Sequence, residues 1–223
     1  MNKTTIDYAD YAEHDRRLRG IERHLVTAFL GGLAVGLVGM LLHGEGPDWV
    51  GQLYNPYAYL GLSLVVGASA SRFGWALLTT FLGAVASLVA AMGGSALRGY
   101  EASEIIDSGA VGTNRSLALL VGLGLLAYVT RRDDTWGDVA AGTVGAALIA
   151  DVVHRAAPGF LNNENTFWPG PALVIGLLSV ALVPVLRRNA RARVRSLTLS
   201  ALFGGVLSVT LAAIVVAWIP PAV

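Results

Sequence analysis

The sequence has no cysteine and almost no lysine. Lys3 is the only lysine among the 16 basic residues, and the other 15 are arginines. Without cysteine the chain can form no disulfide, thiolate nucleophile, iron–sulfur cluster or zinc–thiolate centre. Retinal Schiff bases and pyridoxal phosphate chemistry need a lysine inside the protein, and Lys3 lies at the polar N-terminus. These classes of protein are therefore excluded.

Charged residues are scarce as well. They make up 14% of the 223 residues, against roughly 25% in ordinary soluble domains. Apolar residues make up 54%, and a soluble protein of this composition would expose apolar patches that promote aggregation. We therefore expect an all-α, polytopic transmembrane helical bundle with the lipid bilayer as its solvent.

Apolar stretches give the number of membrane spans. A helix needs about 20 mostly apolar residues to cross the hydrocarbon core. Seven stretches approach this length, at about 24–42, 55–71, 73–97, 116–130, 137–157, 171–186 and 196–219. The second, fourth and sixth are the shorter ones. A five-span arrangement, in which two of them are re-entrant, is the alternative to seven spans.

The arginines favour seven spans and orient them. Cytoplasmic loops of membrane proteins are enriched in Lys and Arg. With a cytoplasmic N-terminus and seven spans, every basic residue except Arg98, Arg115 and Arg155 lies on the inner side. Aromatic residues, including Tyr57, mark the outer interface. The sequence thus predicts a multi-pass protein of the cell membrane with its C-terminus outside, and its Arg-, Ala- and Gly-rich composition suggests a bacterial inner membrane.

Residues 1–23 form a basic segment ahead of the transmembrane domain of residues 24–223. More than 20 polar residues precede the first span, which is not the pattern of a cleavable signal peptide. Tyr8, Tyr11, Leu18 and Ile21 fall roughly on one helical face. We interpret the segment as cytoplasmic and amphipathic, either lying on the anionic inner leaflet or serving only as a topology signal.

The spans after the first resemble three copies of one unit, a short helix followed by a basic turn and a longer helix. The short helices share a pattern of Leu60-Gly61-Leu62, Val121-Gly122-Leu123 and Ile175-Gly176-Leu177. All three units have the same orientation, so they would be parallel hairpin repeats. Because Gly and Ala are abundant, chance is the alternative to internal duplication.

Small residues spaced by four follow one face of each longer helix. The rows are Gly83, Ser87 and Ala91; Gly142, Ala146 and Ala150; Gly204, Ser208 and Ala212; and, in the first span, Gly32 and Gly36. Small residues at this spacing let helix backbones approach closely in lipid. We expect these rows to be helix–helix contacts.

The fifth predicted span contains the candidate binding residues Asp151, His154 and Arg155. Spacings of three and four bring these side chains together on one helical face. Ionisable residues inside a span are costly and usually face a bundle interior or an aqueous cavity. The cluster could bind an ion or substrate or relay protons. Alternatively it is structural, with Arg155 extending to the headgroups and Asp151 neutralising it.

Two outer segments could add to this cluster. His43, Glu45 and Asp48 follow the first span and carry nitrogen and oxygen metal ligands, but nothing in their spacing requires a metal. The Asn-rich loop of residues 160–170 could form a lip over the cluster. We predict neither a metal nor another cofactor.

No enzyme motif is present: the sequence has no His-Glu-x-x-His, Gly-x-Ser-x-Gly or P-loop. We therefore predict no catalytic residues and no enzyme. The leading functional hypothesis is a transport-related protein, either a small permease or the membrane subunit of a transporter. The alternative is a non-catalytic scaffold or accessory subunit. The expected partners are the lipid bilayer and either another protein or further copies of this chain, but no nucleic acid.

Overall fold

The computed structural model describes residues 8–42, 47–98, 109–156, 169–187 and 189–218. These residues form eight helices and contain no strand, which confirms the all-α prediction for the described part of the chain. The helices are α1 (Tyr8–Leu42), α2 (Asp48–Tyr54), α3 (Tyr57–Ser69), α4 (Phe73–Leu97), α6 (Gly109–Val129), α7 (Thr135–Ala156), α8 (Gly170–Leu186) and α9 (Ala190–Trp218).

Four helical segments within the described residues are long and apolar enough to cross a membrane. They are Leu18–Leu42, Phe73–Leu97, Gly112–Val129 and Thr135–Val153, and the apolar helices Tyr57–Ser69 and Gly170–Leu186 are shorter. The chain is thus compatible with an integral membrane protein. Helix α6 begins at Gly109, ahead of the predicted start of the fourth span at residue 116, and extends over 21 residues. Seven spans stay a prediction.

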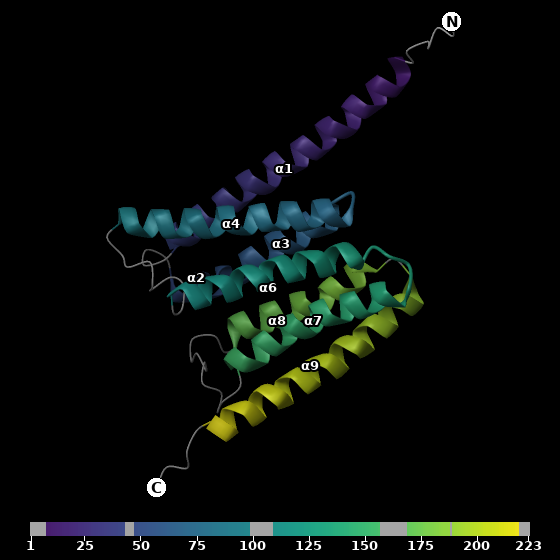
Figure 1. The fold of residues 1–223 in the computed structure, drawn as a ribbon. Helices are drawn as coiled ribbons and strands as arrows, with labels where there is room; N and C mark the ends of the chain where they lie inside the picture. Colours follow the sequence, from purple (N-terminus) through teal and green to yellow (C-terminus); the bar gives the residue numbers. More distant parts are fainter. Residues whose placement is uncertain (1–7, 43–46, 99–108, 157–168, 188, 219–223) are drawn as a thin grey trace, which may run out of the picture.

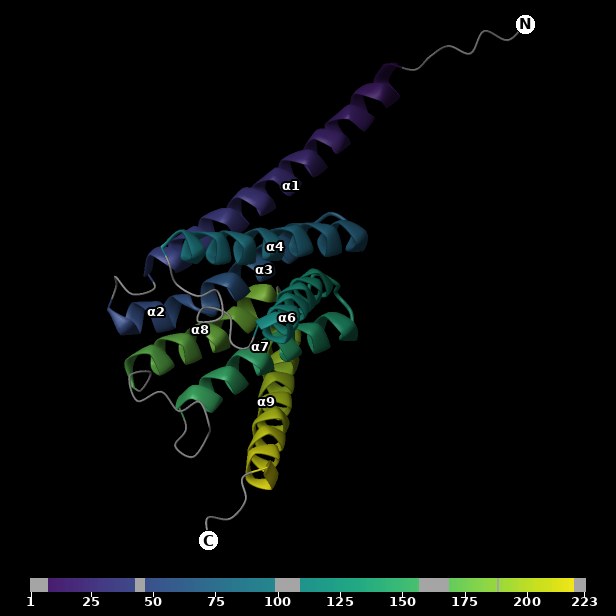
Figure 2. The same ribbon diagram turned by 60° about the vertical axis from the view of Figure 1, so that its left-hand side comes forward.

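The helices lie side by side as a bundle, and α1 projects from it (Figures 1 and 2). The turns α3–α4, α6–α7 and α8–α9 all lie at one end of the bundle, on the right in Figure 1. We call this the basic end, because the three turns contain Arg72, Arg131, Arg132 and Arg187. The sequence predicts that this end faces the cytoplasm. The opposite end, near α2, is called the α2 end.

Helix α1 is continuous from Tyr8 to Leu42, over 35 residues. At 1.5 Å per residue it is about 50 Å long, which exceeds the hydrocarbon thickness. Its N-terminal half rises away from α4 and leaves the side of the bundle at an angle, on the side of the basic end (Figure 1). The predicted boundary between residues 1–23 and 24–223 therefore falls inside one helix, and the division into two regions stays a prediction.

The most extensive helix contacts are between α1 and α4 and between α7 and α9. In both pairs the two helices run in the same chain direction and cross at an angle (Figures 1 and 2), and they meet through glycines. A Cβ on Gly36 would lie against the backbone oxygen of Ser87 and 2.8 Å from the Cβ of Ala90. A Cβ on Gly142 would lie 2.7 Å from the Cβ of Leu199. Small residues of the predicted rows thus form both contacts, as expected from close packing in lipid.

The predicted hairpins are not the tightest units of the fold. Helices α3 and α6, which belong to different hairpins, contact each other more extensively than either contacts its own hairpin partner. Packing therefore links successive units rather than enclosing each one. Internal duplication stays a prediction.

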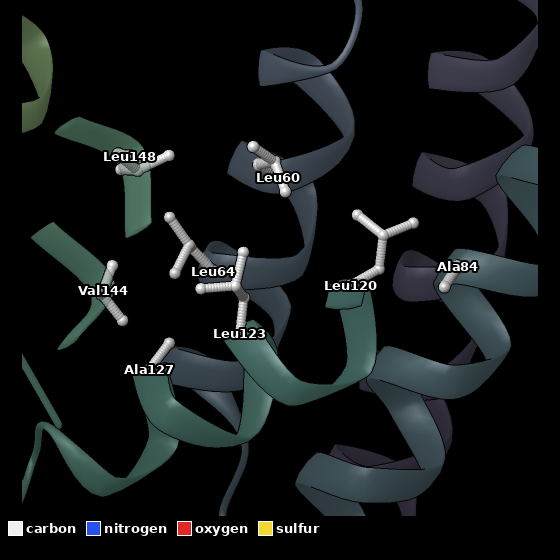
Figure 3. Packing of buried hydrophobic residues seen from close by; sticks show 8 residues of the cluster. All are labelled: Leu60, Leu64, Ala84, Leu120, Leu123, Ala127, Val144 and Leu148. Carbon is white, nitrogen blue, oxygen red and sulfur yellow. The ribbon is translucent and has the colours of Figure 1, made fainter. Parts of the chain in front are cut away.

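A buried apolar cluster lies where α3, α4, α6 and α7 meet (Figure 3). Its members are Leu60, Leu64, Ala84, Leu120, Leu123, Ala127, Val144 and Leu148. The cluster fixes the four helices around the candidate site described below.

Candidate functional site

Helix α7 holds the predicted pair at its α2 end. The helix begins after Asp134, whose Oδ1 accepts a hydrogen bond from the Gly137 N–H at 3.0 Å, as at an N-cap. In the last turn of the helix, which ends at Ala156, Arg155 Nε lies 3.2 Å from Asp151 Oδ2. The two side chains are 22% and 33% exposed, so the pair is partly shielded rather than at an open surface. The predicted i,i+4 contact is present.

Tyr57 is a third member that sequence reasoning missed. Its hydroxyl donates a hydrogen bond of 2.6 Å to the same oxygen, Asp151 Oδ2. The Asn55-Pro56 turn ends just before Tyr57, which places this side chain at the first position of α3. The available signal was the shared depth of Tyr57 and Asp151 near the outer boundary, but the tyrosine was interpreted as an interfacial aromatic.

Other predicted members of the site lie outside the described residues. The His154 side chain is one of them, although its backbone belongs to α7. Residues 43–46 and 157–168 and the side chain of Asp48 are outside as well. Among the described residues, no group of three or more His, Cys, Asp or Glu side chains is arranged to hold a metal ion.

A cavity of about 420 Å³ lies beside the Asp151–Arg155 pair, between α3, α4, α6 and α7. Asn55, Ser116, Asp151 and Arg155 give it a polar lining at the α2 end, and apolar side chains form the remaining wall. Apolar lining residues include Leu60, Leu88, Leu119, Leu120, Leu123 and Leu148. Figure 3 shows four of these leucines, contributed by α3, α6 and α7.

Toward the basic end the helices close together. A Cβ on Gly67 would lie 2.5 Å from the carbonyl carbon of Gly124 and 2.8 Å from its Cα. A Cβ on Gly124 would in turn lie 2.9 Å from the Thr80 Cβ. Helix α3 is thus in near backbone contact with α6, and α6 packs against the Thr80 side chain of α4, next to Leu123, the lining residue of α6 nearest the basic end. This close packing separates the cavity from the basic end.

A second polar cluster, which the sequence analysis did not identify, lies at the basic end. Asp138 Oδ1 is 2.6 Å from Arg187 Nη2, and Asp138 Oδ2 is 2.7 Å from Arg195 Nη2. The side chains of Asp138 and Arg187 are 3% and 4% exposed, whereas that of Arg195 is 58% exposed. Both carboxylate oxygens lack an aligned hydrogen-bond donor, so the contacts are ion pairs. The signal was Asp138 itself, an acid within a predicted span.

Arginine side chains also donate hydrogen bonds to backbone carbonyls at the ends of the three helices that end at the basic end. Arg131 Nη1 donates to the Ala70 carbonyl after α3 at 2.6 Å, and Arg187 Nη1 donates to the Thr130 carbonyl after α6 at 2.7 Å. Arg193 Nε donates to the Arg187 carbonyl after α8 at 2.8 Å. The final carbonyls of a helix have no partner within it and carry its negative partial charge. These arginines supply a hydrogen-bond donor for the carbonyl and a positive charge for the negative end of the helix.

Comparison with protein-family models, with curated proteins and with solved structures finds no match to this chain.

Proposed function

We propose that this chain is a transport-related integral membrane protein, either a small permease or the membrane subunit of a transporter. Its substrate site would be the cavity beside Asp151. The observation that carries this proposal is the ion pair at the wall of the cavity. Ionisable groups within a membrane span are costly and usually line substrate or ion pathways, and the cavity volume lies within the usual range for small-molecule sites.

The lining limits what the cavity can hold. Asp151 and Arg155 neutralise each other, so the site favours no net charge. Tyr57, Arg155 and Asp151 nevertheless offer both donors and acceptors within one small area. Leucines line the rest of the cavity. A small solute with one polar end and an apolar body matches this division.

The close packing on the basic-end side of the cavity determines from which side a solute would reach it. In the present conformation a solute would enter from the α2 end, because the Gly67–Gly124 contact blocks the way to the basic end. Release at the basic end would require α3 and α6 to separate. The Arg131–Ala70 hydrogen bond, which joins the ends of these helices, would have to break in the same movement.

Flux measurements on the purified protein in liposomes would test this proposal. Small amino acids without net charge would be screened first, with monocarboxylates and inorganic ions as the charged comparisons, followed by Asp151→Asn and Tyr57→Phe. Both changes keep side-chain shape; the first removes the charge at the cavity wall, and the second removes the hydroxyl that donates to Asp151 from outside the lining. The matched control is Asp134→Asn, which removes a carboxylate in the exposed turn at the basic end while keeping an N-cap residue.

Flux that is lost in Asp151→Asn and Tyr57→Phe but retained in Asp134→Asn would support the site. Wild-type flux in both cavity variants would show that the Asp151 pair is structural. Absence of flux for every solute in the panel would argue against an autonomous permease and favour a subunit or scaffold.

The scaffold alternative has one observation in its favour. The N-terminal half of α1 projects away from the rest of the bundle, and Arg19, Glu22 and Arg23 on it are exposed. Purification in mild detergent from native membranes, followed by mass determination, tests this alternative. A stoichiometric partner that is lost when Arg19, Glu22 and Arg23 are together replaced with serine would favour the scaffold. Elution of the chain alone would favour the permease.

A further inference from the structure

A second cavity opens at the basic end, where α1 diverges from α3 and α4 (Figure 1). Its volume is about 700 Å³. Helix α1 contributes Leu18, Gly20, Ile21 and His24, and the α3–α4 side contributes Ser69, Ser71, Arg72, Trp75 and Thr79. We call it the α1 crevice. It is distinct from the Asp151 cavity and shares no lining residue with it.

Two polar groups in the α1 crevice have no partner in the described part of the chain. The Arg72 side chain is exposed and, unlike Arg131, Arg187 and Arg193, makes no hydrogen bond or ion pair there. The Nε2 atom of His24 is buried without a hydrogen bond. Buried polar atoms in folded proteins nearly always have a partner. The crevice therefore presents two polar groups, the Arg72 guanidinium and His24 Nε2, that could hydrogen-bond to a ligand.

The charge and shape of the crevice define the missing partner. None of its lining residues is acidic, and Arg72 supplies a guanidinium that matches phosphate geometry. Beside these polar groups, Leu18 is 49% exposed, and Ile21 and the Trp75 ring form an apolar wall. A ligand with a phosphate at one end and a hydrocarbon chain at the other would satisfy both parts.

We propose that the α1 crevice binds the headgroup of an anionic phospholipid from the cytoplasmic leaflet. Arg72 contacts the phosphate, His24 and Ser71 border it, and the first part of an acyl chain covers Leu18 and Trp75. Anionic lipids are concentrated in that leaflet, and basic pockets between helices on the cytoplasmic side suit their headgroups. The inference rests on the predicted cytoplasmic orientation of the basic end and is independent of the transport role.

Such a lipid would have a structural consequence. On the C-terminal side of the crevice, α1 meets α4 through Gly32 and Gly36. On its N-terminal side, α1 has separated from the bundle. A headgroup between α1 and the α3–α4 turn would fix the angle at which α1 leaves. The lipid would then position the projecting half of α1.

Native mass spectrometry of the purified protein, titrated with phosphatidylglycerol, tests the proposal. Phosphatidylcholine is the neutral-headgroup comparison, and glycerol phosphate and inorganic phosphate are the soluble comparisons. The main variant is Arg72→Gln. The matched control is Arg132→Gln, which removes an arginine from the next turn at the same end, where it pairs with Asp134 and is 61% exposed. His24→Ala is the second variant, because it alters the crevice from α1 and leaves the α3–α4 turn unchanged.

We expect phosphatidylglycerol to bind more tightly than phosphatidylcholine. Arg72→Gln should weaken phosphatidylglycerol binding by about tenfold or more, the loss expected for a charge-assisted hydrogen bond, and Arg132→Gln should leave it nearly unchanged. Equal weakening in both arginine variants would overturn the site in favour of diffuse attraction. Equal binding of the two lipids would also refute it. Binding of glycerol phosphate or inorganic phosphate as tight as that of the lipid would identify a soluble phosphate ligand instead. If Arg72→Gln does not fold, unchanged lipid binding in His24→Ala would refute the crevice.

Discussion

Replacement of Asp138 with alanine should destabilise the protein by far more than loss of a surface charge does. Asp138 and Arg187 are both almost fully buried, and their charged atoms are 2.6 Å apart. Without the carboxylate, the Arg187 guanidinium would remain buried, with only the Thr130 and Arg132 carbonyls as acceptors. Removal of one partner from a buried pair costs about 3–5 kcal/mol, because the other charge stays uncompensated.

Arg195 provides an internal comparison. It contacts the same carboxylate at 2.7 Å, but its side chain is 58% exposed. Water can therefore solvate its charge, and an exposed ion pair contributes about 0–1 kcal/mol. Arg195→Ala should accordingly be close to neutral. Asp138→Ala removes the buried member of this cluster, and Arg195→Ala removes the exposed one, so comparing them separates the effect of burial.

Thermal unfolding in detergent, followed by tryptophan fluorescence, measures this difference. For a chain of this length about 1 kcal/mol corresponds to 2–4 °C in the unfolding midpoint. Asp138→Ala should thus lower the midpoint by roughly 6–20 °C, and Arg195→Ala by less than about 4 °C. The double variant Asp138→Ala/Arg187→Met should recover part of the loss, because no charge is then left buried. Equal, small shifts in both single variants would show that the cluster is solvated and does not hold the turns together.

Three further predictions follow from close contacts and from one shifted pKa. Gly67→Ala should destabilise the protein by about 1–3 kcal/mol in the same assay, because its Cβ would meet the α6 backbone; Gly61→Ala, with open space around it, should not, and equal effects would contradict the contact. Gly36→Ala should loosen α1 from α4 and increase proteolysis of α1, whereas Gly20→Ala, also with open space, should leave the cleavage rate unchanged. The pKa of Asp134 is lowered by the backbone N–H that it accepts at the start of α7 and further by the neighbouring arginine. Its stabilising contribution is present above the unfolded pKa, near 3.9, and is lost as pH falls through the lower folded pKa. The midpoint difference between wild type and Asp134→Ala should therefore shrink between pH 7 and pH 3, and a constant difference would contradict this assignment.

Hydropathy predicted where apolar segments lie better than where helices end. Residues 73–97 were predicted as a span, and α4 has the same bounds, because basic residues flank the apolar stretch on both sides. For α6 the polar residues Asn114 and Arg115 ended the apolar stretch, yet the helix continues back to Gly109. Backbone hydrogen bonds continue through polar residues, so a hydropathy boundary reports the depth in lipid and not the end of a helix.

The candidate site was predictable only as far as it is local. Asp151 and Arg155 are four residues apart on one helix, so their contact follows from helical geometry alone. Tyr57 is 94 residues away from Asp151 in the chain, and its contact depends on how α3 packs against α7. The Asp138 cluster failed to be predicted for the same reason. Its arginines come from the α8–α9 region, and a single sequence carries no information on that pairing.

The arginines at the basic end were interpreted from the sequence as an orientation signal, but three of them also have a structural role. Arg131, Arg187 and Arg193 each bind a carbonyl at the end of a helix that arrives at this end. A helix that ends here needs a donor and a positive charge whichever leaflet it faces, so these three residues are weak indicators of sidedness. The orientation then rests on basic residues without such a partner, and Arg72 is the one in the α3–α4 turn. Exchange of Arg72 for glutamine should leave the helices intact and weaken the orientation signal, whereas exchange of Arg131 should affect stability first. Topology reporters fused after α4, compared with unfolding midpoints for the two variants, would separate these roles. A lower midpoint for Arg72→Gln than for Arg131→Gln would contradict the assignment.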